Sequence, residues 1–268
     1  ASDMSGWLLL GLPGALYASG LVEAWIAIGL TLGAAANWII VAPRLREQTE
    51  RLGDALTIPQ FLANRFPEQG TVLRVTSAVI IVGFFTVYTA SGMVGGGKLF
   101  ATAFAGSLPT GGLSDYMFGI LLTAGIVLIY TTIGGFLAVS LTDFVQGMIM
   151  MIALVVMPLV ILTDSGNSIA LSAVPQAGFL SLTEGATLIG VISAVTWGLG
   201  YFGQPHIIVR FMAIDRVENV PRAGVIGMGW MIISLVGAVA VGLAGRAYAD
   251  GNRLTVEDPE TIFIILSQ

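Results

Sequence analysis

The chain has 268 residues, of which 56% are hydrophobic and only 10% are charged, and it has a formal net charge of -5 and no cysteine. A soluble domain carries about 25% charged residues, so this chain has too little charge to cover a globular surface in water. The missing cysteines exclude disulfides and cysteine-ligated metals, and the negative net charge argues against nucleic acid as a partner.

Apolar segments of membrane-spanning length recur along the chain. A transmembrane helix needs about 20 mostly apolar residues. The opening segment, Trp7 to Ala18, is shorter and predicts the second half of a helix. The further candidate spans are residues 22–42, 72–103, 117–137, 140–163, 186–212 and 223–248. The sequence therefore predicts an all-α membrane protein, and the chain, which opens without a methionine, is expected to be an incomplete transmembrane domain over residues 1–268.

The connections between these spans differ in length and charge. Residues 43–57 are rich in arginine, and Thr57 with Pro59 predicts the capped start of a short helix on the membrane surface. A tight turn is expected at 134–141, a longer polar loop at 164–185 and a charged loop at 250–260.

The charges of these connections predict the orientation. Alternate crossings place loops 43–71 and 213–222 on one side, with most of the arginines, and loops 103–116, 164–185 and 249–260 on the other, with most of the acids. Positively charged loops remain in the cytoplasm. The sequence thus predicts a multi-pass protein of the inner or plasma membrane whose arginine-rich loops are cytoplasmic.

Residues 2–6, Ser-Asp-Met-Ser-Gly, stand directly before the apolar run that begins at Trp7. An ionisable residue beside a membrane span is expensive, and it is by default a hypothesis of function. An unwound backbone here would offer carbonyl oxygens to a sodium ion, and the helix that follows would direct its N–H groups at a substrate carboxylate. The alternative is an ordinary helix cap at the interface.

The segment Trp197 to His206 interrupts the span 186–212 with three glycines and a proline. These residues weaken a helix severely, which predicts a break at membrane depth. Trp197 and Tyr201 are four residues apart, so on an α-helix their rings share one face and could hold a small apolar ring. The alternative is a glycine-rich packing face. Two broken spans together are a pointer to a transporter site.

Three further residues carry weaker signals. Tyr88 stands near the middle of the long span 72–103, where its hydroxyl needs a partner, and a helix–helix hydrogen bond is the alternative. Asp143 follows the tight turn and guides a cation inward, caps a helix or pairs with a loop arginine. His206 is the only histidine and, with no second histidine or acid near it in the sequence, is a poor candidate for a metal ligand or a proton relay.

Four stretches resemble the sodium/solute symporter family. They are residues 1–9 (Ala-Ser-Asp-Met-Ser-Gly-Trp-Leu-Leu), Phe61 to Phe66, 134–143 (Gly-Gly-Phe-Leu-Ala-Val-Ser-Leu-Thr-Asp) and 197–206 (Trp-Gly-Leu-Gly-Tyr-Phe-Gly-Gln-Pro-His). The last of them is similar to the proline branch of the family. The resemblance implies a LeuT-like core, an inverted repeat of five plus five helices, which is present here only in part.

The resemblance also implies a function and its residues. It implies sodium-coupled symport of a small amino acid, L-proline, into the cell by alternating access, with Na⁺ as the co-transported ion. The sodium ligands implied are the carbonyls of Ala1 and Met4, with Asp3 and Ser5 at the same site. Asp143 would lie on the inward sodium route. The substrate residues implied are Ser5, Gly6, Tyr88, Trp197, Tyr201, Gln204 and Pro205.

Rival functions meet specific objections in the sequence. A retinal protein needs a lysine in the middle of its last span, and the only lysine is Lys98. An intramembrane enzyme needs a nucleophile–base pair or a metal cluster, for which one histidine and no cysteine leave little material. A proton-coupled member of the same family, or one with another solute, stays open as the alternative. The expected partners are the substrate, sodium and lipid, with no obligate protein partner.

Overall fold

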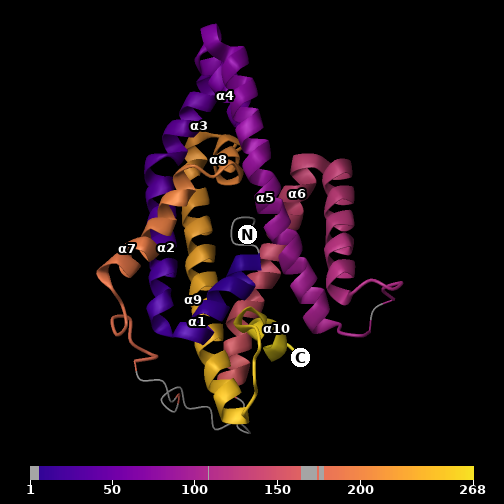
Figure 1. Ribbon diagram of the computed structural model, residues 1–268. Helices are drawn as coiled ribbons and strands as arrows, with labels where there is room; N and C mark the ends of the chain where they lie inside the picture. Colours follow the sequence, from indigo (N-terminus) through magenta and orange to yellow (C-terminus); the bar gives the residue numbers. More distant parts are fainter. Residues whose placement is uncertain (1–5, 108, 164–173, 175–177) are drawn as a thin grey trace. The chain divides into compact units, whose positions relative to one another are not determined.

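The computed structural model describes residues 6–107, 109–163, 174 and 178–268, and in this part of the chain every regular element is a helix. The elements in chain order are η1 (Trp7–Gly11), α1 (Leu12–Ser19), η2 (Leu21–Glu23), α2 (Ala24–Ile40), α3 (Ala42–Arg51), α4 (Ile58–Arg65), η3 (Pro67–Gln69), α5 (Gly70–Ala103), α6 (Asp115–Thr163), α7 (Leu188–Thr196), η5 (Trp197–Phe202), α8 (Pro205–Met212), η6 (Val217–Asn219), α9 (Val220–Asn252), η7 (Pro259–Thr261) and α10 (Ile262–Leu266) (Figure 1). The element η1 is a π-helix, and the other η elements are 3₁₀-helices.

The membrane-length helices agree with the predicted spans. Among the described residues, the helical segments long and apolar enough to cross a membrane are Leu21–Arg51, Pro67–Ala103, Asp115–Thr163 and Val217–Asn252. Two shorter apolar helices, Trp7–Ser19 and Leu188–Phe202, fall where the sequence predicts a half-helix and a broken span. The prediction of an all-α membrane protein is therefore confirmed.

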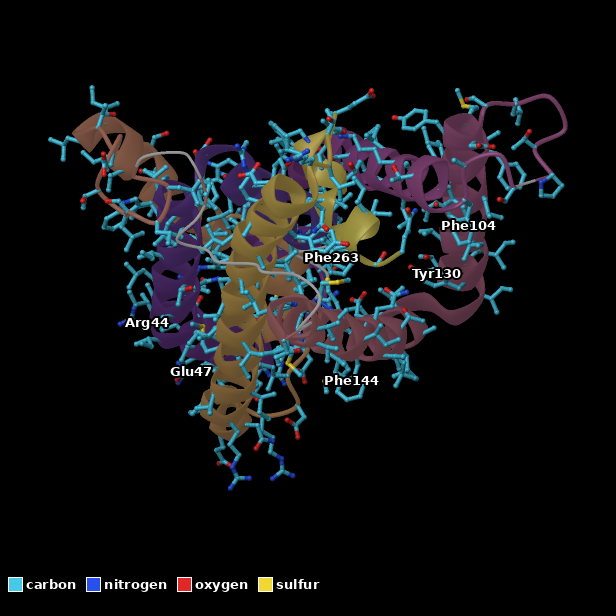
Figure 2. All side chains as sticks on the ribbon, turned by 90° about the horizontal axis from the view of Figure 1, so that it is seen from below. Arg44, Glu47, Phe104, Tyr130, Phe144 and Phe263 are labelled. Atoms are coloured by element: carbon cyan, nitrogen blue, oxygen red, sulfur yellow. The ribbon has the colours of Figure 1, made fainter. Side chains whose placement is uncertain are left out.

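The helix α6 contains both spans predicted for residues 117–137 and 140–163. It is 49 residues long, and Gly135 has non-helical backbone angles (φ 54°, ψ -151°) that separate two arms (Figure 1). A positive φ is accessible to glycine because it has no Cβ. The bend is therefore narrower than the predicted turn at 134–141, since the kink falls on a single glycine and both arms remain helical up to it. Tyr130 and Phe144 lie on the two arms in Figure 2.

The predicted capped start of a short helix after Thr57 is confirmed, and the place of this helix on the membrane surface stays a prediction. The helix α4 begins after Thr57, whose hydroxyl accepts a hydrogen bond from the backbone N–H of Gln60 at 3.3 Å. Pro59 stands in the first turn, where its missing N–H leaves no helical bond unmade.

The described chain divides into two compact units. Unit 1 comprises residues 1–24, 89–186 and 233–268, and unit 2 comprises residues 25–88 and 187–232.

In unit 1, glycines let backbones approach closely. A Cβ on Gly14 of α1 would lie 2.9 Å from the backbone of Glu260 in η7, and a Cβ on Gly242 of α9 would lie 2.6 Å from the carbonyl oxygen of Pro13. At the same place Lys98 of α5 donates to the carboxylates of Asp258 and Glu260. The Lys98 ammonium holds the pKa of Asp258 below its ordinary value.

In unit 2, a buried arginine ties α3 to the end of α8. Arg46 is 5% exposed and donates to the carbonyl oxygens of Met212 and Asp215 at 2.9 and 3.0 Å. Its guanidinium also pairs with the carboxylates of Asp54 at 2.9 Å and Glu50 at 3.3 Å. The positive charge thus lies at the C-terminus of α8, where the helix dipole is negative.

Candidate functional site

The predicted break at residues 197–206 is present in unit 2. The helix α7 ends at Thr196, and the chain continues as the 3₁₀-helix η5, Trp197–Phe202. Gln204 has extended backbone angles, and α8 begins at Pro205. Glycine has the lowest helix propensity after proline, and proline is accepted at the first position of a new helix. The local sequence is therefore sufficient to explain where the helix stops and where it restarts.

Tyr201 shows how the broken backbone is satisfied. In an α-helix its carbonyl would accept the N–H of the residue four positions later, which is Pro205 and has no N–H. Instead, the side-chain amide of Asn37 in α2 donates to this carbonyl at 2.9 Å. Asn37 is 1% exposed. A freed backbone group at membrane depth needs such a protein partner.

The glycines of the break have different roles. A Cβ on Gly198 would overlap the carbonyl oxygen of Gly29 in α2, and a Cβ on Gly33 would overlap the carbonyl oxygen of Gly198. Gly198 is therefore a packing glycine, which the sequence left open as an alternative. A Cβ on Gly203 would meet nothing within 4 Å, so packing does not require a glycine at this position.

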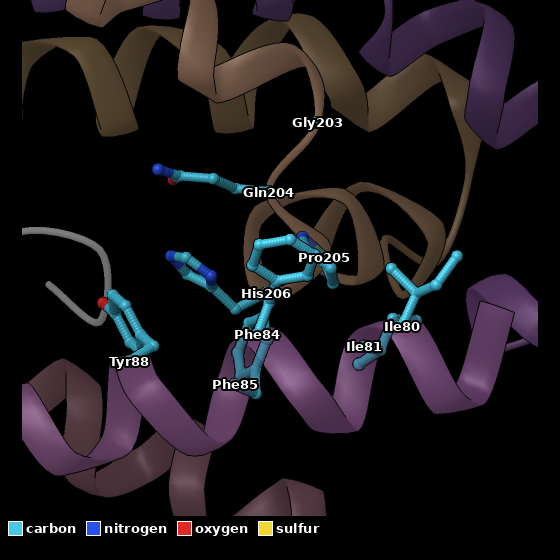
Figure 3. Close-up of a pocket in the computed structure, with 9 residues that line it drawn as sticks. All are labelled: Ile80, Ile81, Phe84, Phe85, Tyr88, Gly203, Gln204, Pro205 and His206. Atoms are coloured by element: carbon cyan, nitrogen blue, oxygen red, sulfur yellow. The ribbon is translucent and has the colours of Figure 1, made fainter.

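A pocket of about 330 Å³ lies beside the break, within unit 2. One wall is a face of α5 with Ile80, Ile81, Phe84, Phe85 and Tyr88, and the other is Gly203, Gln204, Pro205 and His206 (Figure 3). Binding pockets for small molecules have volumes of roughly 300–1,000 Å³ and are mostly apolar with a few polar groups. The pocket has that size and composition.

Three rings of this pocket contact one another. The rings of Tyr88 and His206 are stacked, with centroids 5.2 Å apart and planes at 27°. Phe85 meets His206 edge-on at 5.6 Å and 67°. Sequence reasoning missed the other residues that line this pocket, which are Ile80, Ile81, Phe84, Phe85, Gly203 and His206. The α5 residues of the wall repeat at positions i, i+1, i+4, i+5 and i+8, a helical pattern that could have identified this face.

Gln204 brings a polar group to the apolar pocket. Its side-chain oxygen Oε1 is buried and has no hydrogen-bond partner among the described residues. A buried carbonyl oxygen without a donor is costly, so it favours a ligand that presents an N–H group.

Of the predicted substrate residues, the structure brings Tyr88, Gln204 and Pro205 together. Among the described residues, the lining of this pocket includes neither Trp197 nor Tyr201. The expectation that these two rings share one helical face is wrong, because η5 is a 3₁₀-helix and residues four apart are rotated by about 120°. Tyr201 is 6% exposed, whereas Trp197 is 51% exposed.

The predicted sodium residues Ala1, Asp3, Met4 and Ser5 lie outside the described residues. Gly6 is described, belongs to unit 1 and has helical backbone angles. It leads into the π-helix η1, and π-helical turns are frequent at functional sites. The predicted half-helix does begin here, with η1 and α1 ending at Ser19.

Asp143 lies in unit 1, on the second arm of α6 after Gly135, and is partly exposed. Among the described residues, no group of three or more histidine, cysteine, aspartate or glutamate side chains could hold a metal ion.

Comparisons with known proteins agree on one family. The model of the "Sodium:solute symporter family" matches residues 1–259. A sodium/proline symporter of Staphylococcus aureus is 52% identical over 271 residues, which cover 100% of this chain and 51% of the relative. The sodium/proline symporters of the S. aureus strains JH9 and NCTC 8325 match to the same extent. The chain therefore spans about half the length of these curated relatives. No solved structure matches it significantly.

Proposed function

This chain belongs to the sodium:solute symporter family, and from that premise we propose that the full-length protein carries L-proline into the cell by sodium-coupled symport, through alternating access. The observation that supports this most directly is the pocket of unit 2, which lies where a broken helix meets α5. Such breaks are where transporters of this kind bind substrates.

The pocket has groups that fit the ring and the amine of proline. Tyr88 and Pro205 offer apolar faces to the pyrrolidine ring of proline. The unpartnered oxygen of Gln204 can accept a hydrogen bond from the N–H of the substrate's amine. By family resemblance, Trp197, Tyr201, Ser5 and Gly6 also belong to the substrate site. The proteins named as sodium/proline symporters support proline as the substrate at 52% identity.

The proposed sodium site consists of Ala1, Asp3, Met4 and Ser5, with Asp143 on the inward route. Sodium bound there would strengthen proline binding, and proline would strengthen sodium binding by the same factor. This reciprocity is what couples the two solutes.

The proposed architecture is the inverted repeat of five plus five helices, of which residues 1–268 form part of one transporter domain. The break after Thr196 supports it, because inverted-repeat transporters carry broken helices at membrane depth. We place the protein in the inner or plasma membrane with its arginine-rich loops in the cytoplasm.

The test is uptake of radiolabelled proline by cells or liposomes that contain the full-length protein, with sodium and with choline replacing it. We expect sodium-dependent uptake. Equal uptake in both media would contradict sodium coupling, and uptake that follows a pH gradient instead would favour the proton-coupled alternative.

Asp3→Asn tests the sodium site. A carboxylate at membrane depth without a cation tends to take up a proton, so sodium should bind its ionised form. Removal of the charge should raise the sodium concentration needed for half-maximal proline uptake by about tenfold or more, a loss of roughly 1.4 kcal/mol of binding free energy.

Asp143→Asn is the matched control, since charges near an aqueous mouth are screened. It should raise the required sodium concentration less than Asp3→Asn does. Unchanged sodium dependence in Asp3→Asn would remove Asp3 from the coupling mechanism.

A further inference from the structure

His206 is the residue that connects the two walls of the pocket. It is the second residue of α8, directly after the break, and its ring lies against two rings of α5. Figure 3 shows Gln204 and His206 extending from the break on one side, with Tyr88 and Phe85 on α5 on the other. Through these contacts the start of α8 is in direct contact with the middle of α5.

The geometry determines which face of Tyr88 stays available. The ring planes of Tyr88 and His206 are within 27° of parallel, so the imidazole covers one face of the phenol ring. Phe85, one turn earlier on α5, packs edge-on against the same imidazole and tilted against Tyr88, with centroids 5.5 Å apart. The ring of Tyr88, which contacts both His206 and Phe85, therefore loses rotamer freedom before a ligand arrives. This lowers the entropic cost of binding.

We infer that His206 is a positioning residue for substrate affinity, because its stacked ring holds Tyr88 in the orientation that receives the apolar ring of the substrate. This inference rests on the proposed function for the identity of the substrate. It assigns to His206 no ligand contact, no metal and no proton transfer. It predicts that substitutions of His206 change the affinity for the substrate by changing the orientation of Tyr88.

The first experiment measures proline uptake by the full-length protein carrying His206→Ala, His206→Phe, Tyr88→Ala or the double substitution of both positions with alanine. His206→Ala should raise KM by about three- to tenfold, the size expected for the loss of one aromatic pair, and leave the maximal rate within about twofold. His206→Phe restores a stackable ring and should recover most of the affinity. The double variant should be no worse than Tyr88→Ala, because residues that act through one another are not additive.

The control is Phe104→Leu, which removes a ring from another aromatic pair of the chain, Phe100 with Phe104 in unit 1. It should leave KM unchanged. Additive losses in the double variant, or equal losses in His206→Ala and His206→Phe, would overturn the inference in favour of a direct polar role for the imidazole.

A binding measurement separates this inference from the proposed function. Gly203→Cys places a thiol at the pocket, at an exposed position where a Cβ meets nothing within 4 Å. In a cysteine-free background, proline should slow its alkylation, and His206→Ala should shift the protecting concentration upward as it shifts KM. If proline does not slow alkylation of the Gly203→Cys protein in which His206 is intact, the proposed substrate is wrong.

If proline is not the substrate, a measurement without ligand still tests whether His206 positions Tyr88. With 3-fluorotyrosine at position 88, the ¹⁹F resonance should be narrow in wild type and in His206→Phe, and shifted and broadened in His206→Ala. A resonance that His206→Ala leaves unchanged would overturn the inference whatever the substrate is.

Discussion

The carbonyl of Tyr201 needs a distant partner because of a residue four positions away. Pro205 cannot donate to it, and Asn37 of α2 replaces that donor at 2.9 Å. Pro205 also lines the pocket, next to Gln204. The same proline thus frees a carbonyl on one side of the break and forms part of the candidate site on the other. A single buried amide satisfies the carbonyl that the proline leaves without its helical donor.

At the residue scale, the burial of the two aromatics predicts different outcomes for their removal. Tyr201→Ala removes a side chain that is 6% exposed, and it should destabilise the protein by about 3 kcal/mol or more. Trp197→Ala removes a half-exposed ring and should change the melting temperature little. Because the family resemblance places this ring at the substrate site, its removal should weaken proline binding by about 1–3 kcal/mol.

Thermal unfolding and proline binding of the full-length protein in detergent, measured on both variants and on Tyr201→Phe as the ring-retaining control, check this. Normal proline binding by Trp197→Ala would remove that ring from the substrate site. An equal loss of melting temperature in both alanine variants would contradict the difference in burial.

At the scale of elements, close backbone contact holds the 3₁₀-helix η5 on α2. Gly198→Ala adds a methyl group where the carbonyl of Gly29 already lies, so η5 must move away from α2. Overpacking of this kind costs on the order of 1–3 kcal/mol. We expect a lower melting temperature and weaker proline binding, because η5 leads directly into the pocket wall.

Gly203→Ala is the matched control for Gly198→Ala. Its φ of -116° is accessible to alanine and its Cβ would lie in open space, so the melting temperature should stay close to that of wild type. Equal destabilisation by the two substitutions would show that glycine is needed for backbone freedom and not for packing.

The far end of the same broken helix depends on Arg46. Its guanidinium joins α3 to the carbonyl oxygen of Met212, the last residue of α8, and to that of Asp215 just after it, in a forked geometry that lysine cannot reproduce. Arg46→Ala should destabilise the protein by about 3 kcal/mol, the usual cost of breaking a buried ion pair, and Arg46→Lys should recover only part of it.

Arg51→Ala is the control for Arg46, since Arg51 is exposed and pairs on the surface with Glu47. It should change stability by less than about 1 kcal/mol. Chemical or thermal unfolding of the three variants tests these predicted differences in stability. An Arg46→Ala variant as stable as Arg51→Ala would show that α8 is held by its apolar face alone.

At the scale of the whole molecule, the positive-inside rule predicts that the arginine-rich loops and the acidic loops lie on opposite sides of the membrane. Single cysteines at Gln48 in α3 and at Asn252 at the end of α9 should be labelled by a membrane-impermeant maleimide from opposite faces of oriented vesicles. Glu47→Cys, at an exposed position of α3, is a second reporter for the arginine-rich side. Labelling of both ends from the same face would refute the predicted number of crossings.

The features that the sequence predicted correctly depend on neighbouring residues. Lipid as the solvent follows from composition, the start of α4 follows from Thr57 and Pro59, and the break follows from the glycines and Pro205 within one or two turns. Local backbone sterics and hydrogen bonding determine each of these. The type of helix inside the break did not follow, because 3₁₀ and α geometry differ little in local energy and the packing of Gly198 on α2 decides between them.

The contacts that only the tertiary structure decided join residues far apart in the chain. The stacking of His206 on Tyr88, the amide of Asn37 on the carbonyl of Tyr201 and the guanidinium of Arg46 on the end of α8 each need two elements to be placed to within an ångström. The hydrophobic periodicity of the sequence does not indicate such pairs, because each residue fits the helical pattern of its own segment equally well with or without its partner. The sequence by itself therefore determined the solvent, the helices and the place of the break, and the folded chain decided which side chains form the pocket, since that choice is made by packing between helices.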